Sequence, residues 1–275
     1  IAELSRQLDK IKKLLASLLK IDKDMMSTKP YDMEKSYLQL KKLYTSPLFS
    51  EAFAETELYK KLHDFCQEQL KLIEKYKEEF HFVLGAKLKE LMADFSVVSG
   101  QLPILKVKYY TIRFDFANGL ASIWWGPQKE IIKRLSIEPD LIAQTIKTFD
   151  QNLNTKWQTS EDFFRLLKSA YNRYILLNGL EYGTKVNLLD LLPEFIMLLQ
   201  SQSFKIDPIK NHFTEYSRIQ YSYDLYKMKT NPNLVSNIQL SVATFAVTEH
   251  REKSIWVPDN EQGEGTYYQQ IAFNQ

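Results

Sequence analysis

The sequence predicts a predominantly helical α+β protein. A long coiled-coil-like helical region at residues 1–99 precedes an α+β part at residues 100–275, which contains a small antiparallel sheet. Three observations predict this fold class. Apolar residues recur at near-heptad spacing through the first third of the chain. Gly100 and Pro103 then end the helical pattern. Beyond them, several short segments alternate apolar and polar residues with the period of a β-strand.

Composition limits the class of protein. The chain has 275 residues, of which 44% are hydrophobic and 25% charged, so a large core can form in one or two domains. The formal net charge of +2 is too small for the whole molecule to attract nucleic acid or an anionic membrane. Cys66 is the only cysteine, which excludes an internal disulfide and indicates a reducing compartment. We therefore expect a cytoplasmic protein.

The sequence predicts no contact with a membrane. No apolar run approaches the roughly 20 residues of a membrane-spanning helix, and the first residues do not have the pattern of a secretory leader. The chain opens at Ile1 already in helical periodicity, so we expect further residues to precede it in the full-length protein.

Three helices are predicted in the first region. The first ends before Pro30, because a proline disfavours helix in the residue that precedes it. A second is predicted over residues 32–44, and a third over residues 50–95, which would be roughly 65 Å long. The first helix has a heptad-like apolar seam, which needs a partner inside or outside the chain. The seam residues are Leu4, Leu8, Ile11, Leu15 and Leu18.

The middle of the chain predicts a β-hairpin followed by helices. Residues 105–125 alternate on both sides of Asn118-Gly119, a strong tight-turn signal. Gly126-Pro127 then indicates a helix start, since proline is favoured in a first turn. Within residues 127–200 we expect four helices, and Thr159-Ser160-Glu161-Asp162 is a start signal for the third. Their ranges are 128–135, 138–150, 159–178 and 187–200.

Strands are predicted again over residues 218–273. The first begins at Arg218, where Ile219, Tyr221, Tyr223 and Leu225 alternate with other residues. Further strands are predicted over residues 238–246, 254–257 and 266–273. A small antiparallel sheet that follows helices is compatible with a winged-helix-like arrangement.

The motifs of the sequence predict no catalytic residue, cofactor or metal. Gly263-Glu264-Gly265 is followed by a strand-like segment and not by the helix that a phosphate loop needs, so a hairpin loop is the simpler interpretation. His63 and His81 lie about 27 Å apart on one helix and cannot share an ion. Cys66 lies beside the apolar seam of that helix and is interpreted as a structural residue rather than a nucleophile.

One basic segment is a candidate for binding nucleic acid. It carries Lys205, Lys210, Arg218, Lys227 and Lys229 among several Tyr and Phe residues. Cations can neutralise phosphates and aromatic rings can stack on bases. The competing interpretation is a polar surface over core aromatics, since Asp207, Glu215 and Asp224 dilute the charge.

Three functions are compatible with these patterns. We favour a non-catalytic interaction protein, a subunit of a larger intracellular assembly that docks through its long helices and their Leu4–Leu18 seam. An alternative is a DNA-binding accessory subunit with a winged-helix-like C-terminal part. A second alternative is a metal-dependent nuclease that uses Asp224, Glu249 and Glu252. The expected partner is another protein or a second copy of the chain, with nucleic acid as a further candidate and no small-molecule ligand. Because the sequence has no clear catalytic motif, we expect a protein that is not an enzyme.

Overall fold

The computed structural model describes residues 30–47, 57–95, 98–155, 157 and 159–274, and the single positions 9, 12, 13 and 16. The predicted seam of Leu4, Leu8, Ile11, Leu15 and Leu18 lies outside these described residues. The chain divides into two compact units. The first comprises residues 1–90 together with the hairpin tip 115–120, and the second comprises residues 91–114 and 121–275.

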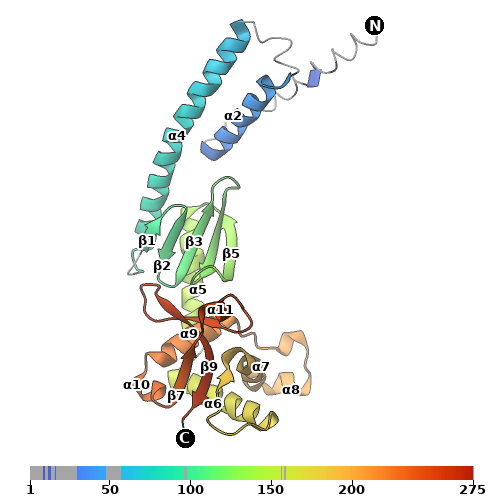
Figure 1. The fold of residues 1–275 in the computed structure, drawn as a ribbon, viewed down its shortest axis with the longest axis vertical. Coiled ribbons are helices and arrows are strands. Elements are labelled where there is room, and N and C mark those ends of the chain that lie inside the picture. The colour runs from blue at the N-terminus through green and yellow to red at the C-terminus, as the bar shows by residue number, and fades with distance from the viewer. Residues whose placement is uncertain are drawn as a thin grey trace. The chain divides into compact units, whose positions relative to one another are not determined.

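Two helices form the described part of the first unit (Figure 1). α2 spans Pro30–Tyr44 and α4 spans Glu57–Leu91, so the predicted second and third helices are confirmed over the described residues. They lie side by side: Lys77 on α4 forms a 2.6 Å ion pair with Glu34 on α2. Tyr31 at the start of α2 stacks on Phe116 of the hairpin tip, with ring centroids 4.9 Å apart.

A five-stranded antiparallel sheet dominates the middle of the chain. Its strands follow one another in chain order, as β1 (Val98–Gln101), β2 (Ile104–Val107), β3 (Tyr110–Asp115), β4 (Leu120–Trp125) and β5 (Glu130–Ser136). In the register of β2 and β3, Val107 pairs with Tyr110. Lys108, at φ +48°, therefore forms a two-residue turn with Tyr109.

Helix α5 (Pro139–Asn154) packs against one face of this sheet. The hydroxyl of Tyr110 on β3 donates to Asp150 on α5 at 2.9 Å, and the rings of Tyr110 and Phe149 meet edge to face. Ile142 and Ile146 on α5 are fully buried.

A second sheet lies near the C-terminus. Its longest strand, β9 (Gly265–Phe273), pairs with β6 (Val186–Asn187), β7 (Ile238–Val242) and β8 (Ile255–Pro258), all antiparallel. The helices of this region are α6 (Ser160–Leu177), α7 (Leu188–Leu199), α8 (Gln202–Ile206), α9 (Arg218–Lys229), α10 (Pro232–Val235) and α11 (Phe245–Thr248), with a 3-10 turn at Lys210–His212.

Helix α9 is the buried centre of the second unit. Nine of its residues are buried, among them Tyr221 and Ser222. The hydroxyl of Ser222 accepts from the indole N–H of Trp125 on β4 at 2.9 Å and donates to the carbonyl of Trp256 on β8. The helix therefore ties the first sheet to the second.

The predicted fold class, with one small sheet after a helical arm, is wrong: the protein is mixed α+β with two sheets (Figure 1). The predicted helix at 128–135 is strand β5. Gly126 at φ +58° and Gln128 at φ +62° turn the chain back toward the sheet, and the N–H of Gly126 donates to the carbonyl of Tyr109. Pro127 therefore occupies a turn and not a first helical turn.

The predicted strand from Arg218 is also wrong, because this segment is α9, capped by Ser217. A helix that is buried on every side has no polar face, so its sequence carries no 3.6-residue period. The winged-helix-like arrangement depends on the same predicted strand, so it is wrong as well. The predicted helices at 138–150, 159–178 and 187–200 are confirmed as α5, α6 and α7, and the predicted start signal of α6 contains its cap, Thr159.

Candidate functional site

Helix α4 carries two apolar stripes. One is buried and contains Cys66, Ile73, Leu84 and Leu88. The thiol of Cys66 lies 3.5 Å from the carbonyl of Tyr37 on α2, which shows that this stripe faces the neighbouring helix. The second stripe is exposed. Its members, Phe65, Leu72, Tyr76 and Val83, are 44–63% accessible to solvent.

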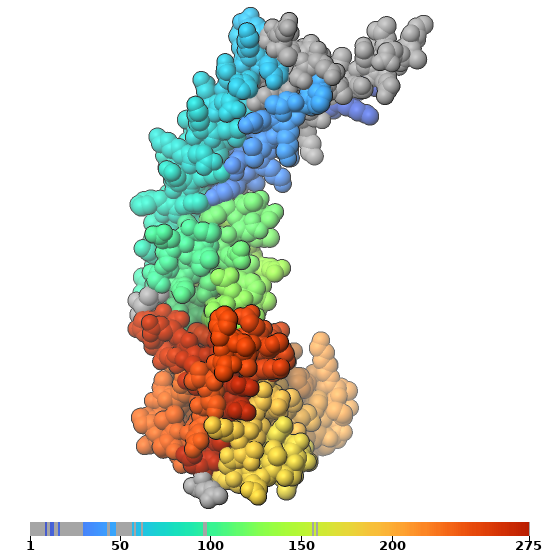
Figure 2. Space-filling view, in the orientation of Figure 1, coloured from blue at the N-terminus to red at the C-terminus, as the bar shows by residue number. Residues whose placement is uncertain are grey.

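The exposed stripe follows from the sequence of the helix. Phe65, Leu72 and Val83 each precede a residue of the buried stripe, and one residue turns a helix by about 100°. The two stripes are therefore adjacent, and α2 covers mainly the buried one, with the ring of its Tyr37 also 6.1 Å from that of Phe65. Figure 2 shows α4, in cyan, uncovered along the side that turns away from α2. Exposed apolar side chains that repeat along a helix are typical of a contact surface.

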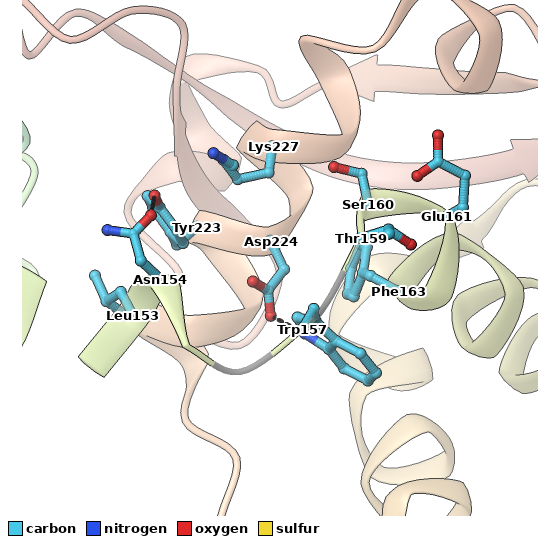
Figure 3. Close-up of a pocket in the computed structure, with 10 residues that line it drawn as sticks. All are labelled: Leu153, Asn154, Trp157, Thr159, Ser160, Glu161, Phe163, Tyr223, Asp224 and Lys227. Carbon is cyan, nitrogen blue, oxygen red and sulfur yellow. Dashed lines mark hydrogen bonds between the residues drawn. The ribbon is translucent and has the colours of Figure 1, made fainter. Parts of the chain in front are cut away.

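A cavity of about 320 Å³ lies in the second unit, beside α9 (Figure 3). The end of α5 supplies Asn154, the segment before α6 supplies Trp157, and α9 supplies Tyr223, Asp224 and Lys227. The remaining residues are Leu153, Thr159, Ser160, Glu161 and Phe163. Two members of the predicted sites, Asp224 and Lys227, are thus brought together.

The carboxylate of Asp224 forms the floor of this cavity and is only 4% exposed. One of its oxygens accepts from the indole N–H of Trp157 at 2.7 Å and from the hydroxyl of Tyr216. The other accepts from the side-chain amide of Gln220 at 3.0 Å. A buried carboxylate is tolerated only when donors replace its lost water.

Burial, reinforced by the charge of Asp224, raises the pKa of Tyr216 well above its usual range. The Tyr216 hydroxyl therefore stays protonated and remains a donor to the carboxylate. This arrangement fixes Asp224 as an anchor for the segment that contains Trp157. Lys227, Ser160 and Glu161 offer polar groups to a small ligand, but among the described lining residues no nucleophile is paired with a base.

The structure does not assemble the predicted nuclease site. Glu249 and Glu252 are exposed near α11, whereas Asp224 is a buried residue of α9. Within the described part of the chain, no three His, Cys, Asp or Glu side chains are grouped as a metal site would require.

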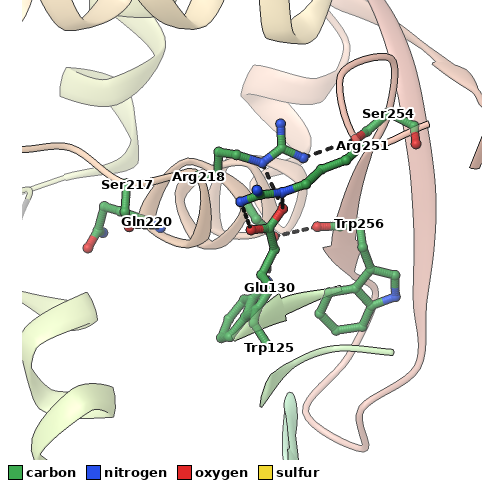
Figure 4. A network of polar contacts seen from close by, with 9 residues as sticks. Trp125, Glu130, Ser217, Arg218, Gln220, Arg251, Ser254 and Trp256 are labelled. Atoms are coloured by element: carbon green, nitrogen blue, oxygen red, sulfur yellow. Dashed lines mark hydrogen bonds and ion pairs between the residues drawn. The ribbon is translucent and has the colours of Figure 1, made fainter. Parts of the chain in front are cut away.

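Two of the predicted nucleic-acid-binding residues are occupied by contacts within the protein. Arg218 forms a 2.7 Å ion pair with Glu130 and also donates to the carbonyl of Ser254 (Figure 4). Lys229 pairs with Asp259 at 2.6 Å. The other three are exposed: Lys205 on α8, Lys210 in the 3-10 turn and Lys227 at the cavity rim.

The Glu130 network joins β5 to α9 and to the loop before β8. Arg251 donates to both oxygens of Glu130, while Arg218 donates to one of them (Figure 4). Burial acts to raise the pKa of Glu130, but the hydrogen bond from Arg251 and the charge of Arg218 outweigh it and hold that pKa below its usual range. The sequence gives no sign of this network, since Glu130 and Arg251 are 121 residues apart.

Comparisons with known proteins identify no relative. No family model, no curated protein and no solved structure matches the chain. Among the described residues, no helix has the length and apolar character needed to cross a membrane.

Proposed function

We propose that this protein is a non-catalytic interaction protein, a subunit of a larger assembly that docks through its long helix α4. The observation that carries the proposal is the exposed stripe of Phe65, Leu72, Tyr76 and Val83. Burying such side chains contributes about 25 cal/mol per Å² of apolar surface to association, against the entropy cost of bringing two chains together. A cytoplasmic location belongs to the same proposal and is supported by the single cysteine, Cys66, since a chain with one cysteine has no internal disulfide.

The occupant that fits this stripe is α4 of a second copy. Successive members are separated by seven, four and seven residues, and this spacing reads the same from either end. In an antiparallel pair related by a two-fold axis, Phe65 would therefore meet Val83 of the second copy, and Leu72 would meet Tyr76. The same axis would place Gln69 opposite Glu79, where the amide can donate to the carboxylate.

Light scattering of the purified chain tests this proposal directly. We expect the mass of a dimer. The double variant Leu72→Gln, Val83→Gln should be a monomer with an unchanged helical circular dichroism spectrum, since both side chains are exposed. A wild-type monomer would overturn the proposal.

A matched control uses two exposed apolar residues of the second unit. Leu176 is 81% exposed and Ile206 is 76% exposed. The double variant Leu176→Gln, Ile206→Gln removes similar side chains, and we expect it to remain a dimer. If this control also became a monomer, the contact would not lie on α4.

The two alternative functions gain no comparable support. A duplex-DNA-binding subunit would need Arg218 and Lys229 for phosphates, and both already pair with carboxylates. A nuclease would need Asp224, Glu249 and Glu252 in one metal site.

A further inference from the structure

One face of the five-stranded sheet is left largely uncovered by the described residues. Strand residues alternate between the two faces. The register pairs Leu105 with Ile112 on the buried face, and Ile104 with Arg113 on the other. The buried face, which α5 covers, contains Leu105, Val107, Tyr110, Ile112, Phe114, Ala121, Ile123 and Trp125. On the opposite face, Ser99, Gln101, Lys106 and Arg113 are exposed.

The sheet is strongly basic. Residues 98–136 carry six basic and two acidic side chains, a net charge of +4 against +2 for the whole chain. Both acids have partners: Asp115 accepts from Asn118, and Glu130 pairs with two arginines. Four cations of the sheet are exposed and make no ion pair within the part of the chain that the structure describes. They are Lys106, Arg113, Lys133 and Arg134.

Aromatic groups accompany these cations. Alternation along β4 places Ala121, Ile123 and Trp125 in the core and Trp124 on the open face. Trp124 is half-buried, and its indole N–H is buried without a hydrogen-bond partner among the described residues. A ligand at this face would therefore contact other atoms of Trp124 and not this donor.

A cavity of about 430 Å³ lies at the end of the open face. Lys106, Lys108 and Thr111 line it from the sheet, and Trp256 and Tyr267 line it from β8 and β9. Its size falls in the range of small-ligand pockets, roughly 300–1,000 Å³. Lys108 is held between Asp150 and Glu261, each at 3.9 Å, and Glu264 in the lining accepts from Asn260, so Lys106 carries the positive charge that is available to a ligand.

We propose that the open face of this sheet binds single-stranded nucleic acid, with bases stacking at Trp124 and in the adjoining cavity while Lys106, Arg113 and Arg134 contact phosphates. Only an unpaired base can reach a half-buried ring or enter a cavity, whereas a duplex offers chiefly phosphates. This surface is built from residues other than those of the α4 stripe, so either proposal can fail alone.

Fluorescence anisotropy with labelled oligonucleotides tests the proposal. The probes are oligo-dT and oligo-rU of about a dozen nucleotides, within the site sizes known for single-strand-binding folds, and a duplex of equal length. We expect both single strands to bind with an affinity that falls as salt rises, and the duplex to bind at least tenfold more weakly. A preference for RNA would assign a contact to the 2′-hydroxyl, and equal binding would assign recognition to bases and phosphates. Either result supports the proposal.

Paired charge reversals locate the surface. Lys106→Glu with Arg113→Glu should weaken binding about tenfold or more. It should also reduce the salt dependence, because binding then releases about one counterion fewer from the nucleic acid for each cation removed. Lys205→Glu with Lys210→Glu changes net charge equally on exposed sites of the second unit and should leave binding unchanged. Absence of single-strand binding, equal binding of the duplex, or equal loss in both variants would overturn the proposal.

Trp124 gives an independent readout. Stacking on a base should quench its fluorescence, and Trp124→Phe retains a ring in the sheet while removing that signal. Quenching that persists undiminished in Trp124→Phe would contradict a stacked base at this position.

Discussion

At the scale of single residues, Asp224 shows how a buried charge can serve structure alone. Trp157 can only donate, and the bond from the Gln220 amide to the carbonyl of Leu153 holds that amide as a donor too, so a neutral amide in place of Asp224 would turn its own N–H toward one of them. We expect Asp224→Asn to lower the free energy of unfolding by roughly 2–3 kcal/mol. Lys227→Gln, at the rim of the same cavity, should change it by less than about 0.5 kcal/mol. Urea denaturation measures both, and equal effects would contradict the role of Asp224 as an anchor.

Glu130 predicts a pH dependence of stability. Its pKa is lowered in the folded protein, so the pairing with Arg251 and Arg218 stabilises the fold above the unfolded pKa, near 4.5, and this contribution is lost as pH falls through the folded pKa. Glu130→Gln should therefore be less stable than wild type at pH 7, and the difference should shrink below about pH 4.5. Urea unfolding of both proteins across this range checks the sign. A difference that is constant with pH would refute it.

At the scale of elements, two glycines make room for Trp256. A Cβ on Gly265 would lie 2.4 Å from the Trp256 indole, and one on Gly126 would lie 2.5 Å from it. Gly265→Ala should destabilise the second unit by about 1–3 kcal/mol through this overlap. In a Trp256→Phe background, which removes part of the indole, the same change should cost less. Thermal unfolding of the four proteins in this double-mutant cycle measures the coupling, and strictly additive effects would show that the overlap is relieved elsewhere.

Helices with local signals were predictable from sequence, and those without were not. Thr159 caps α6 and Asn178-Gly179 follows it, so both ends of that helix are marked in the sequence. α9 has a Ser217 cap, but its buried Tyr residues on every side imitate the alternation of a strand. Strand β5 was hidden by Gly126-Pro127, whose turn depends on a positive φ that sequence does not reveal.

At the scale of the whole molecule, contacts between distant residues decide which surfaces exist. The apolar repeat of α4 was visible in the sequence, but only its packing against α2 separates a buried stripe from an exposed one. Of the basic residues chosen from the sequence, Arg218 and Lys229 are paired. The net charge of residues 98–136 can be counted from the sequence. Only the structure shows that these residues form a single sheet, which brings their charges together.

Strand β9 has a consequence for how the protein is made. β6, β7 and β8 all hydrogen-bond to β9 and reach the second sheet only through it. During synthesis, these three strands cannot form their hydrogen bonds to β9 until residues 265–273 have left the ribosome. A chain stopped before Gly265 would present those edges to other chains, so premature termination there should yield aggregates and not a smaller folded protein.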